Sequence, residues 1–354
     1  MTTGIACLLM RGGTSKGAYF LADDLPADPA VRDDLLLRVL GSPDPRQIDG
    51  IGGAHPLTSK VAVISPSAES DVDVDYLFLQ LGVEQATVSD RQNCGNLLAG
   101  VGPFAVERGL VAAGAERTTV RIRMVNSKSV AVATFPTPDG AVDYAGDTAI
   151  CGVPGTAAPV TLDFADTAGS ACGALLPTGS RCDVIDGVEV TCVDNGMPVV
   201  VAAASELGVT GYETVAELAA DAELAERVRS LRLRAGTLMG LGDVETASIP
   251  KVTLVAPARS GGTLCTRTFI PVRPHDSIGV LGAISVGTAA LLDGTTAHDL
   301  ARPPGPDRPL RIEHPTGHLD VTVELDHRPV PVVRRSGVLR TARKLFDGLV
   351  FPRP

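Results

Sequence analysis

The stretch Asn93-Cys94-Gly95-Asn96, followed by the apolar residues 97–109, predicts the element around which this chain folds. Asn93 is a candidate N-cap, and the small apolar residues after it are typical of a helix. Gly100 and Gly102 indicate that this helix is packed closely on all sides instead of on one face. We therefore predict a buried central helix that carries Cys94 in its first turn.

Two side chains near this helix are candidates for proton transfer. Cys94 would lie beside unpaired backbone N–H groups and the positive end of the helix dipole, which favours a thiolate and a neighbouring anion. A buried structural cysteine is the alternative interpretation. Lys60 stands at the start of the apolar strand expected at 61–65. Such a lysine usually extends to solvent, but desolvation would lower its pKa and make it a usable base.

Composition narrows the class of protein. The 354 residues are too many for one ordinary core, and the 44% of hydrophobic residues can fill two. The net charge of −10 argues against a nucleic-acid partner. Seven cysteines without a CxxC motif and six histidines without paired spacing suggest neither a disulfide framework nor a metal site. Without a leader-like or membrane-spanning apolar run, the expected setting is soluble and cytoplasmic, and a homodimer is left open.

The order of the predicted elements repeats once along the chain. Each half has a strand, a glycine turn, a strand, a helix, a lysine entering an apolar strand, another strand and a buried helix with a polar first turn. This order indicates an internal duplication. We predict one domain at 1–185, completed by 340–354, and a second at 186–339. The predicted helices are 29–40, 97–109, 215–232 and 280–292, and the predicted strands are 5–10, 18–21, 61–65, 72–81, 118–125, 129–135, 144–151, 160–164, 188–193, 199–203, 252–255 and 266–272, with further strands in 310–354.

A duplicated unit with a polar helix start in each copy predicts a cleft in which two helix N-termini face one ligand. Backbone N–H groups at both ends would suit a polycarboxylate, and fixed dipoles would stabilise a developing enolate. The candidate proton carriers are Cys94, Lys60, Ser277 and His275. Because no cofactor motif is visible, we predict proton transfer without a cofactor or metal.

Several long motifs resemble the PrpF family, and the likeness extends over nearly the whole chain. The resemblance implies an α+β, diaminopimelate-epimerase-like fold. In that fold, two pseudo-symmetric domains each wrap a curved, mainly antiparallel sheet around a central helix. The motifs that carry the resemblance are Met10-Arg11-Gly12-Gly13-Thr14-Ser15-Lys16-Gly17, Asp49-Gly50-Ile51-Gly52-Gly53, Thr58-Ser59-Lys60-Val61-Ala62, Asn93-Cys94-Gly95-Asn96, Asp194-Asn195-Gly196-Met197-Pro198 and His275-Asp276-Ser277-Ile278-Gly279-Val280.

The resemblance also implies an activity. Members of the family isomerise unsaturated tricarboxylic or related acids without a cofactor, and the run from Arg11 to Lys60 looks most like the 4-oxalomesaconate tautomerases of gallate degradation. We therefore predict keto–enol tautomerisation of 4-oxalomesaconate. The alternatives are a 2-methylaconitate or methylitaconate-type isomerase and, in a different class, a carboxylate-binding protein without turnover.

The family's proton-transfer residues match Lys60 and Cys94. One departure from the related epimerases is that the second helix is expected to begin with His275-Asp276-Ser277 and lacks a cysteine, which disfavours two-base stereoinversion. Lys251 mirrors Lys60, and we expect it to have a structural role or to bind substrate charge. The residues predicted to bind substrate are Arg11, Thr14, Ser15, Ser59, Asn93, Gly95, Asn96, Met197, His275, Ser277, Ile278 and Gly279.

Overall fold

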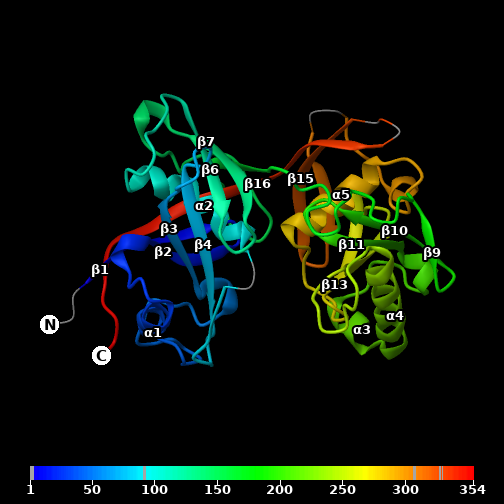
Figure 1. The fold of residues 1–354 in the computed structure, drawn as a ribbon, viewed down its shortest axis with the longest axis horizontal. Coiled ribbons are helices and arrows are strands. Elements are labelled where there is room, and N and C mark those ends of the chain that lie inside the picture. Colours follow the sequence, from blue (N-terminus) through cyan, green and yellow to red (C-terminus); the bar gives the residue numbers. More distant parts are fainter. Residues whose placement is uncertain (1–3, 91–92, 306–307, 327, 329) are drawn as a thin grey trace. The chain divides into compact units, whose positions relative to one another are not determined.

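A computed structural model describes residues 4–90, 93–305, 308–326, 328 and 330–354. The chain forms two compact units, which Figure 1 shows with labelled elements. The first unit contains Met1–Asp163 and Leu339–Pro354, and the second contains Phe164–Val338. The sequence places the division later, after residue 185. Each unit has its own sheet and its own buried helix.

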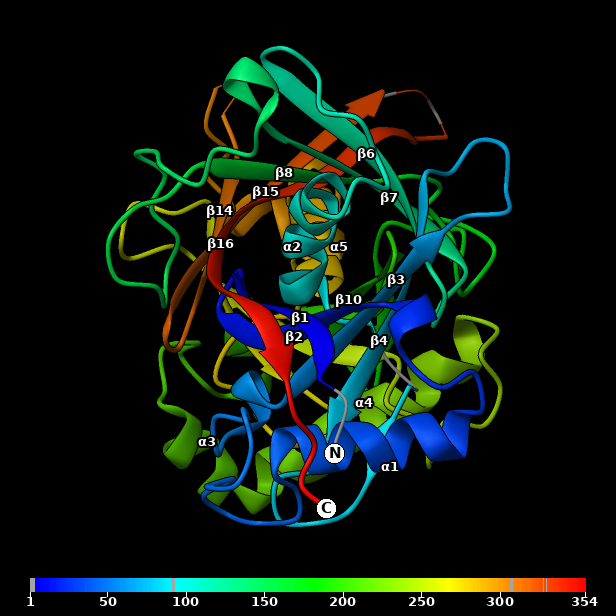
Figure 2. The same ribbon diagram turned by 90° about the vertical axis from the view of Figure 1, so that its left-hand side faces the viewer.

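The first unit is a closed barrel around helix α2 (Gly95–Glu107). Its strands are hydrogen-bonded in the order β1-β2-β3-β4-β6-β7-β8-β16, and β16 also pairs with β1. Figure 2 shows α2 surrounded by these strands, with α1 (Pro29–Leu40) outside them. The strands are β1 (Ile5–Gly12), β2 (Ser15–Leu21), β3 (Lys60–Pro66), β4 (Val74–Leu81), β5 (Val88–Ser89, paired with β4), β6 (Arg117–Met124), β7 (Ser129–Pro136), β8 (Pro159–Phe164) and β16 (Val332–Val350).

Helix α2 is enclosed as its small residues predict. Residues 97–105 are all buried, and two glycines allow aromatic rings to approach the helix backbone. A methyl group added at Gly100 would lie 2.5 Å from the Tyr19 hydroxyl oxygen, and one at Gly102 would lie 2.6 Å from Phe135 Cε1. Asn93 was expected to cap this helix, but the N-cap is Cys94, whose sulfur accepts the Leu97 N–H at 3.5 Å.

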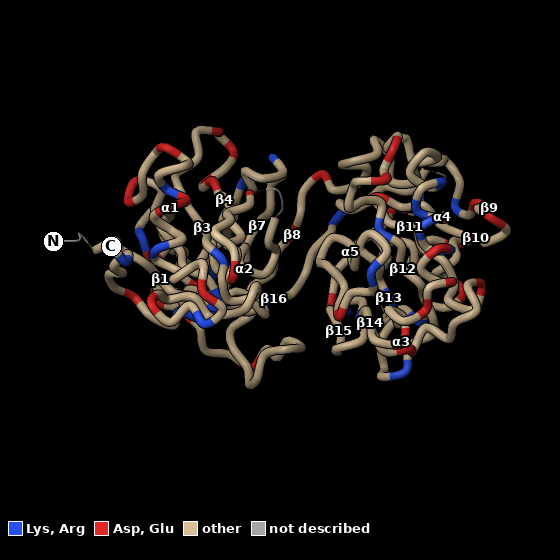
Figure 3. Tube along the Cα trace, turned by 90° about the horizontal axis from the view of Figure 1, so that it is seen from below, with Lys and Arg blue, Asp and Glu red and all other residues tan. Residues whose placement is uncertain are grey.

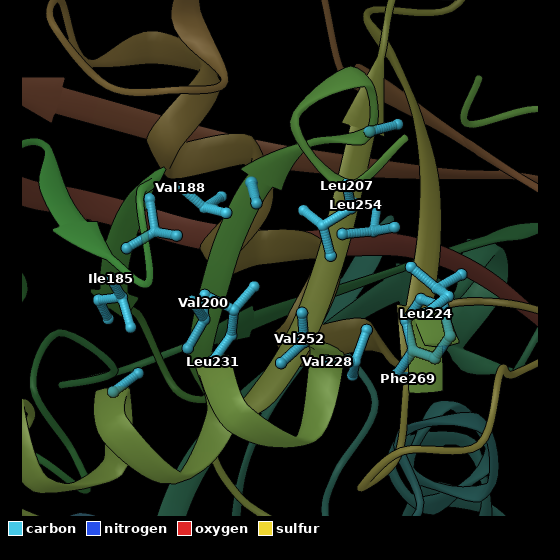
Figure 4. Packing of buried hydrophobic residues seen from close by; sticks show 14 of the residues in the cluster. Ile185, Val188, Val200, Leu207, Leu224, Val228, Leu231, Val252, Leu254 and Phe269 are labelled. Atoms are coloured by element: carbon cyan, nitrogen blue, oxygen red, sulfur yellow. The ribbon is translucent and has the colours of Figure 1, made fainter. Parts of the chain in front are cut away.

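The second unit wraps a sheet around helix α5 (Val280–Leu291), from which residues 282–290 are buried. Its strands are hydrogen-bonded in the order β16-β15-β14-β13-β12-β11-β10-β9. Helix α4 (Ala222–Leu238) packs on the sheet through Leu224, Val228 and Leu231, which meet strand residues such as Val200 and Val252 (Figure 4). The strands are β9 (Asp183–Ile185), β10 (Val188–Asp194), β11 (Pro198–Ala203), β12 (Lys251–Ala256), β13 (Leu264–Phe269), β14 (Leu310–His314), β15 (Gly317–Asp326) and the first part of β16.

The strand register confirms the duplication. Strands β2 and β3 are parallel, with Gly17 opposite Lys60, and β11 and β12 are parallel, with Val199 opposite Lys251. The pairs β4–β6 and β13–β14 are also parallel, whereas β1–β2, β3–β4, β6–β7 and their counterparts in the second unit are antiparallel. The two lysines therefore occupy equivalent positions in the two copies.

Three predicted elements were wrong in detail. Residues 144–151 form no strand and contribute only the bridge between Thr148 and Ala157. The helix expected at 215–232 is two helices, α3 (Val215–Ala220) and α4. The break falls at Asp221, whose carboxylate accepts the Leu224 N–H at 2.9 Å and caps α4. The strand expected at 266–272 ends at Phe269.

Short 3-10 turns are η1 (Ala22–Asp24), η2 (Pro56–Thr58), η3 (Pro138–Gly140), η4 (Ala204–Leu207) and η5 (His298–Leu300).

Charged residues of both signs are spread along both units (Figure 3). Each unit carries both acidic and basic residues. The chain has 41 acidic and 31 basic residues, which gives its net charge of −10. Among the described helices, none is long and apolar enough to cross a membrane.

Candidate active site

Cys94 is held at the start of α2 by its backbone. The carbonyl oxygen of Cys94 accepts hydrogen bonds from Leu98 N at 3.0 Å and from the Tyr76 hydroxyl at 3.3 Å. Its sulfur lies within reach of the first backbone N–H groups of the helix, which have no partner inside the helix itself. A negative charge on this sulfur, or on an anion beside it, would be stabilised there.

Lys60 approaches Cys94 from the first position of β3. Its side chain is only 7% exposed, and its Nζ donates to Gln80 Oε1 at 2.5 Å and lies 5.1 Å from the centre of the Phe78 ring. Burial lowers the pKa of Lys60, and the charge of Cys94 acts in the opposite direction. The amine and the thiol are therefore close enough to influence each other electrostatically, and their role as a proton-transfer pair stays a prediction.

Gln80 is a site residue that the sequence reasoning missed. It stands opposite Lys60 in the antiparallel β3–β4 register. Its Nε2 donates to the carbonyl oxygens of Pro56, Ser59 and Leu81, which turns Oε1 towards the Lys60 amine. The signal that could have found it is the cross-strand position, since directly opposite residues share a face of the sheet.

The glycine turn between β1 and β2 packs against the first turn of α2. Only glycine fits at positions 12 and 13, because a Cβ atom at either position would collide with an oxygen atom of Asn96. Gly13 also has a positive φ of +50°. Asn96 Nδ2 donates to Thr14 Oγ1 at 3.1 Å. Thr14, Ser15 and Asn96 are thus brought together at the helix start that carries Cys94.

Three buried polar atoms at this end of the barrel lack a hydrogen-bond partner within the described part of the chain. They are Ser15 Oγ, Asn93 Oδ1 and Asn96 Oδ1. Buried polar atoms are nearly always hydrogen-bonded, so a cluster of orphaned atoms needs an explanation. The Ser15 hydroxyl can donate to a carboxylate, and the amide oxygens can accept from a hydroxyl. These atoms are suited to a bound polar ligand.

Two other predicted residues of the first unit lie differently. The Ser59 hydroxyl is fully buried and donates to Gln47 Oε1 at 2.8 Å and His55 O at 2.9 Å, so it anchors the loop before Lys60. Gly12 faces α2, and successive residues of a strand point to opposite faces, so Arg11 points away from α2. The structure does not group Arg11 with Lys60 and Cys94.

In the second unit, the predicted residues gather around the start of α5. The N-cap is Gly279 and no side chain caps the helix, which starts at Val280 as the predicted range 280–292 has it. His275 and Ser277, expected in its first turn, lie in the loop before it. Ser277 N donates to His275 Nδ1 at 3.0 Å, which folds the preceding loop back on itself. Ile278 is buried, and the Met197 carbonyl accepts the Ser285 hydroxyl at 2.7 Å, which ties the β10–β11 turn to α5.

Lys251 lies beside this helix start. Its Nζ would be 3.7 Å from a Cβ atom at Gly279, and burial lowers its pKa. Lys251 and Gly279 therefore correspond to Lys60 and Cys94, because each pair combines the first residue of a strand with the N-cap of the buried helix. Within the described residues, no group of three His, Cys, Asp or Glu side chains is placed to hold a metal ion.

The comparison with known protein families now bears on this geometry. The family model described as PrpF protein matches residues 2–353. This chain belongs to the PrpF family. A 4-oxalomesaconate tautomerase of Pseudomonas putida is 58% identical over 98% of this chain and 96% of its own length. A (4E)-oxalomesaconate Delta-isomerase of Novosphingobium sp. is 59% identical over the same shares. The predictions of a PrpF-family protein and of an isomerase are confirmed.

Solved structures agree on the fold. A crystal structure of methylitaconate-delta-isomerase superposes with a TM-score of 0.89 at 35% identity, covering 99% of this chain and 96% of that one. A probable proline racemase superposes with a TM-score of 0.54 at 15% identity, covering 97% and 92%, and supports the fold alone. The predicted α+β, diaminopimelate-epimerase-like fold is confirmed.

Proposed function

We propose that this protein interconverts the keto and enol forms of 4-oxalomesaconate by proton transfer, without a cofactor. The observation that carries the proposal is the buried amine of Lys60 beside the Cys94 thiol at the start of α2. The 58–59% identity to two proteins named for reactions of this compound supports the choice of substrate.

The chemistry needs one base and one acid. In the keto form, a methylene group lies between the keto carbonyl and a carbon–carbon double bond, so its protons are acidic. The base removes one of these protons, the C–H electron pair becomes the new carbon–carbon double bond, and the carbonyl oxygen becomes a dienolate oxygen. An acid then protonates that oxygen and gives the enol. Reversal of the same steps regenerates the keto form.

Lys60 is the stronger candidate for the base in this proposal. Burial disfavours its charged form and increases the fraction of neutral amine near neutral pH. Gln80 fixes the amine by its hydrogen bond, and Cys94 supplies or receives the second proton. The N–H groups of α2 and the hydroxyls of Thr14 and Ser15 would stabilise the negative charge of the dienolate.

The substrate has further carboxylates, which need partners of their own. We propose that the residues around the start of α5, namely Met197, His275, Ser277, Ile278 and Gly279, bind them, in keeping with the duplication. The proposal places the enzyme in the cytoplasmic breakdown of gallate-type aromatic acids.

A second candidate reaction uses the same dienolate. The relative from Novosphingobium is named as a Delta-isomerase, and a shift of the double bond results when the dienolate is protonated on its distant carbon instead of its oxygen. Relatives named 3-methylitaconate isomerase and 2-methyl-aconitate isomerase, each 36% identical, make other unsaturated acids the next substrates to test.

The test is to follow 4-oxalomesaconate with purified protein by ultraviolet absorbance and by proton NMR in deuterated water. Faster keto–enol equilibration supports the tautomerase, and deuterium at the distant carbon supports the Delta-isomerase. Turnover of 2-methylaconitate or methylitaconate, without turnover of 4-oxalomesaconate, would make one of those acids the substrate instead. Binding of these acids without any turnover would overturn the proposal and leave a carboxylate-binding protein.

A further inference from the structure

Three basic side chains stand side by side on the outer face of the first unit's barrel. Arg11 of β1 lies directly opposite Arg343 of β16 on one side and opposite Lys16 of β2 on the other. Directly opposed residues in antiparallel strands share a face, and like charges at such positions destabilise the sheet. This basic row, defined as Lys16, Arg11 and Arg343, therefore needs a compensating charge.

The neighbouring carboxylates are already engaged. Glu107 accepts from Lys344 Nζ at 2.8 Å and from the Tyr144 hydroxyl at 3.2 Å, and Asp347 pairs with Arg108 at 2.8 Å. In the described part of the chain, no ion pair joins any member of the basic row to an acidic residue. The repulsion across the row is thus not balanced by the protein's own side chains.

A cavity of about 350 Å³ opens beside the row. Arg11 and Arg343 both line it, together with the hydroxyl-bearing residues Thr148, Thr156 and Thr341. Residues 144–157, which follow no regular strand, form its opposite wall and include apolar side chains such as Ile150. The volume lies at the lower end of the range for small-molecule sites.

The guanidinium of Arg11 is held ready for a ligand. Its Nη1 donates to Gly13 O at 2.9 Å and to the carbonyl and hydroxyl oxygens of Thr341 at 2.9 and 3.0 Å. These bonds orient the planar group and use only one of its nitrogen atoms, which leaves donors suited to two oxygens of one anion. Burial and the charge of Arg343 lower the pKa of Arg11, so an anion would relieve both effects.

We propose that the cavity between Arg11 and Arg343, which neither Lys60 nor Cys94 lines, binds a small doubly charged oxyanion. Two guanidinium groups and three threonine hydroxyls match a dicarboxylate or inorganic phosphate, and the apolar wall accommodates the carbon chain of a dicarboxylate. The site goes beyond the proposed isomerase activity, and it gives Arg11 a ligand other than the substrate.

The test is the thermal stability of the full chain titrated with succinate and, separately, with inorganic phosphate at constant ionic strength. An anion at about ten times its Kd should raise Tm by about 3 °C. The exposed Arg343→Gln variant should lose this shift, whereas Arg117→Gln, which removes an exposed arginine of β6, should keep it. A Tm shift with only one of the two anions shows which class of anion the cavity binds. A Tm shift with both shows that the cavity recognises charge and not the shape of the anion.

Three results would overturn the inference. The first is the absence of a Tm shift in the wild-type protein with both anions, and the second is a Tm shift that persists in Arg343→Gln. The third is loss of isomerase turnover in a folded Arg343→Gln protein, which would assign the cavity to the substrate site. Failure of the wild-type protein to isomerise any acid would count against the proposed function and leave the anion titration valid.

Discussion

The starts of the two buried helices share one scaffold and differ in chemistry. Helix α2 begins with a cysteine as N-cap, and α5 begins with Gly279 at the equivalent place. A lysine lies near each start, as the first residue of β3 or β12. The comparison teaches that both copies have a lysine near the start of the buried helix, whereas only the first copy has a cysteine there. A thiol that could exchange protons therefore stands only at the first of these two helix starts.

The surroundings of the two lysines differ as well. Lys60 donates to Gln80 on the facing strand. In the second unit the β12–β13 pairing begins with Val252 opposite Phe269, where β13 ends, so Lys251 has no counterpart of Gln80 on that strand. Lys251 is thus suited to bind a ligand oxygen, whereas Lys60 is oriented by the protein.

The largest expected effect concerns the thiol. Cys94→Ala should reduce kcat by at least ~100-fold, the scale for loss of a general acid or base. The matched control is Cys182→Ala, which removes an exposed cysteine of the second unit. This control should leave kcat within about threefold of wild type. Steady-state rates with 4-oxalomesaconate measure both, and a wild-type rate in Cys94→Ala would show that the thiol takes no part.

Alanine substitutions of the two lysines should change different kinetic constants, kcat for Lys60 and KM for Lys251. Lys60→Ala should lower kcat by at least ~100-fold, because the base is lost. Lys251→Ala should raise KM roughly 10- to 150-fold and change kcat little, because removing one charge-assisted hydrogen bond costs roughly 1.5–3 kcal/mol of binding. Equal loss of kcat in both variants would contradict the division of roles, and circular dichroism checks that each variant is folded.

The glycines of the two helices should respond differently to alanine. At Gly102 of α2, the added methyl group would meet Phe135, so Gly102→Ala should destabilise the protein by about 1–3 kcal/mol. At Gly282 of α5, the nearest atom is 3.7 Å away, and Gly282→Ala should be neutral or stabilising by up to about 1 kcal/mol. Urea denaturation measures both, and equal destabilisation would show that α5 is packed as tightly as α2.

Sequence alone predicted the repeated elements because their signals are local. The helix at 29–40 was placed at its observed bounds, since Asp28 caps its start and Gly41 adopts the left-handed conformation at its end. The N-cap of α2 was misplaced by one residue, and His275 and Ser277 lie in the loop before α5 instead of in its first turn. The residue at which a helix begins depends on tertiary contacts that the sequence does not show. Gln80 could not be found without the strand register. Arg11 could not be assigned to a face, because β1 has a register shift between Leu9 and Met10.

The smallest expected effect is a difference in acid sensitivity between the two units. Burial lowers the pKa of His314, at the end of β14, to about 4 from its ordinary 6.5. The turn after it is tied to the loop before α5, because Thr316 Oγ1 donates to the Asp276 carbonyl at 2.8 Å. The first unit has only His55, which is exposed and distant in sequence from α2.

The sign of the pH effect follows from this lowered pKa. Above pH 6.5 the histidine is neutral in both the folded and unfolded states and has no effect. As pH falls from 6.5 towards 4, the unfolded chain binds the proton first, so stability decreases. Between pH 7 and 4.5, His314→Gln should therefore lose about 2 °C less of Tm than the wild-type protein. Hydrogen exchange should show earlier opening at the start of α5 than at the start of α2, and His298→Gln, which changes a half-buried histidine paired with Asp293, is the control. Equal acid sensitivity of the wild-type and His314→Gln proteins would show that this turn does not set the difference between the two helix starts.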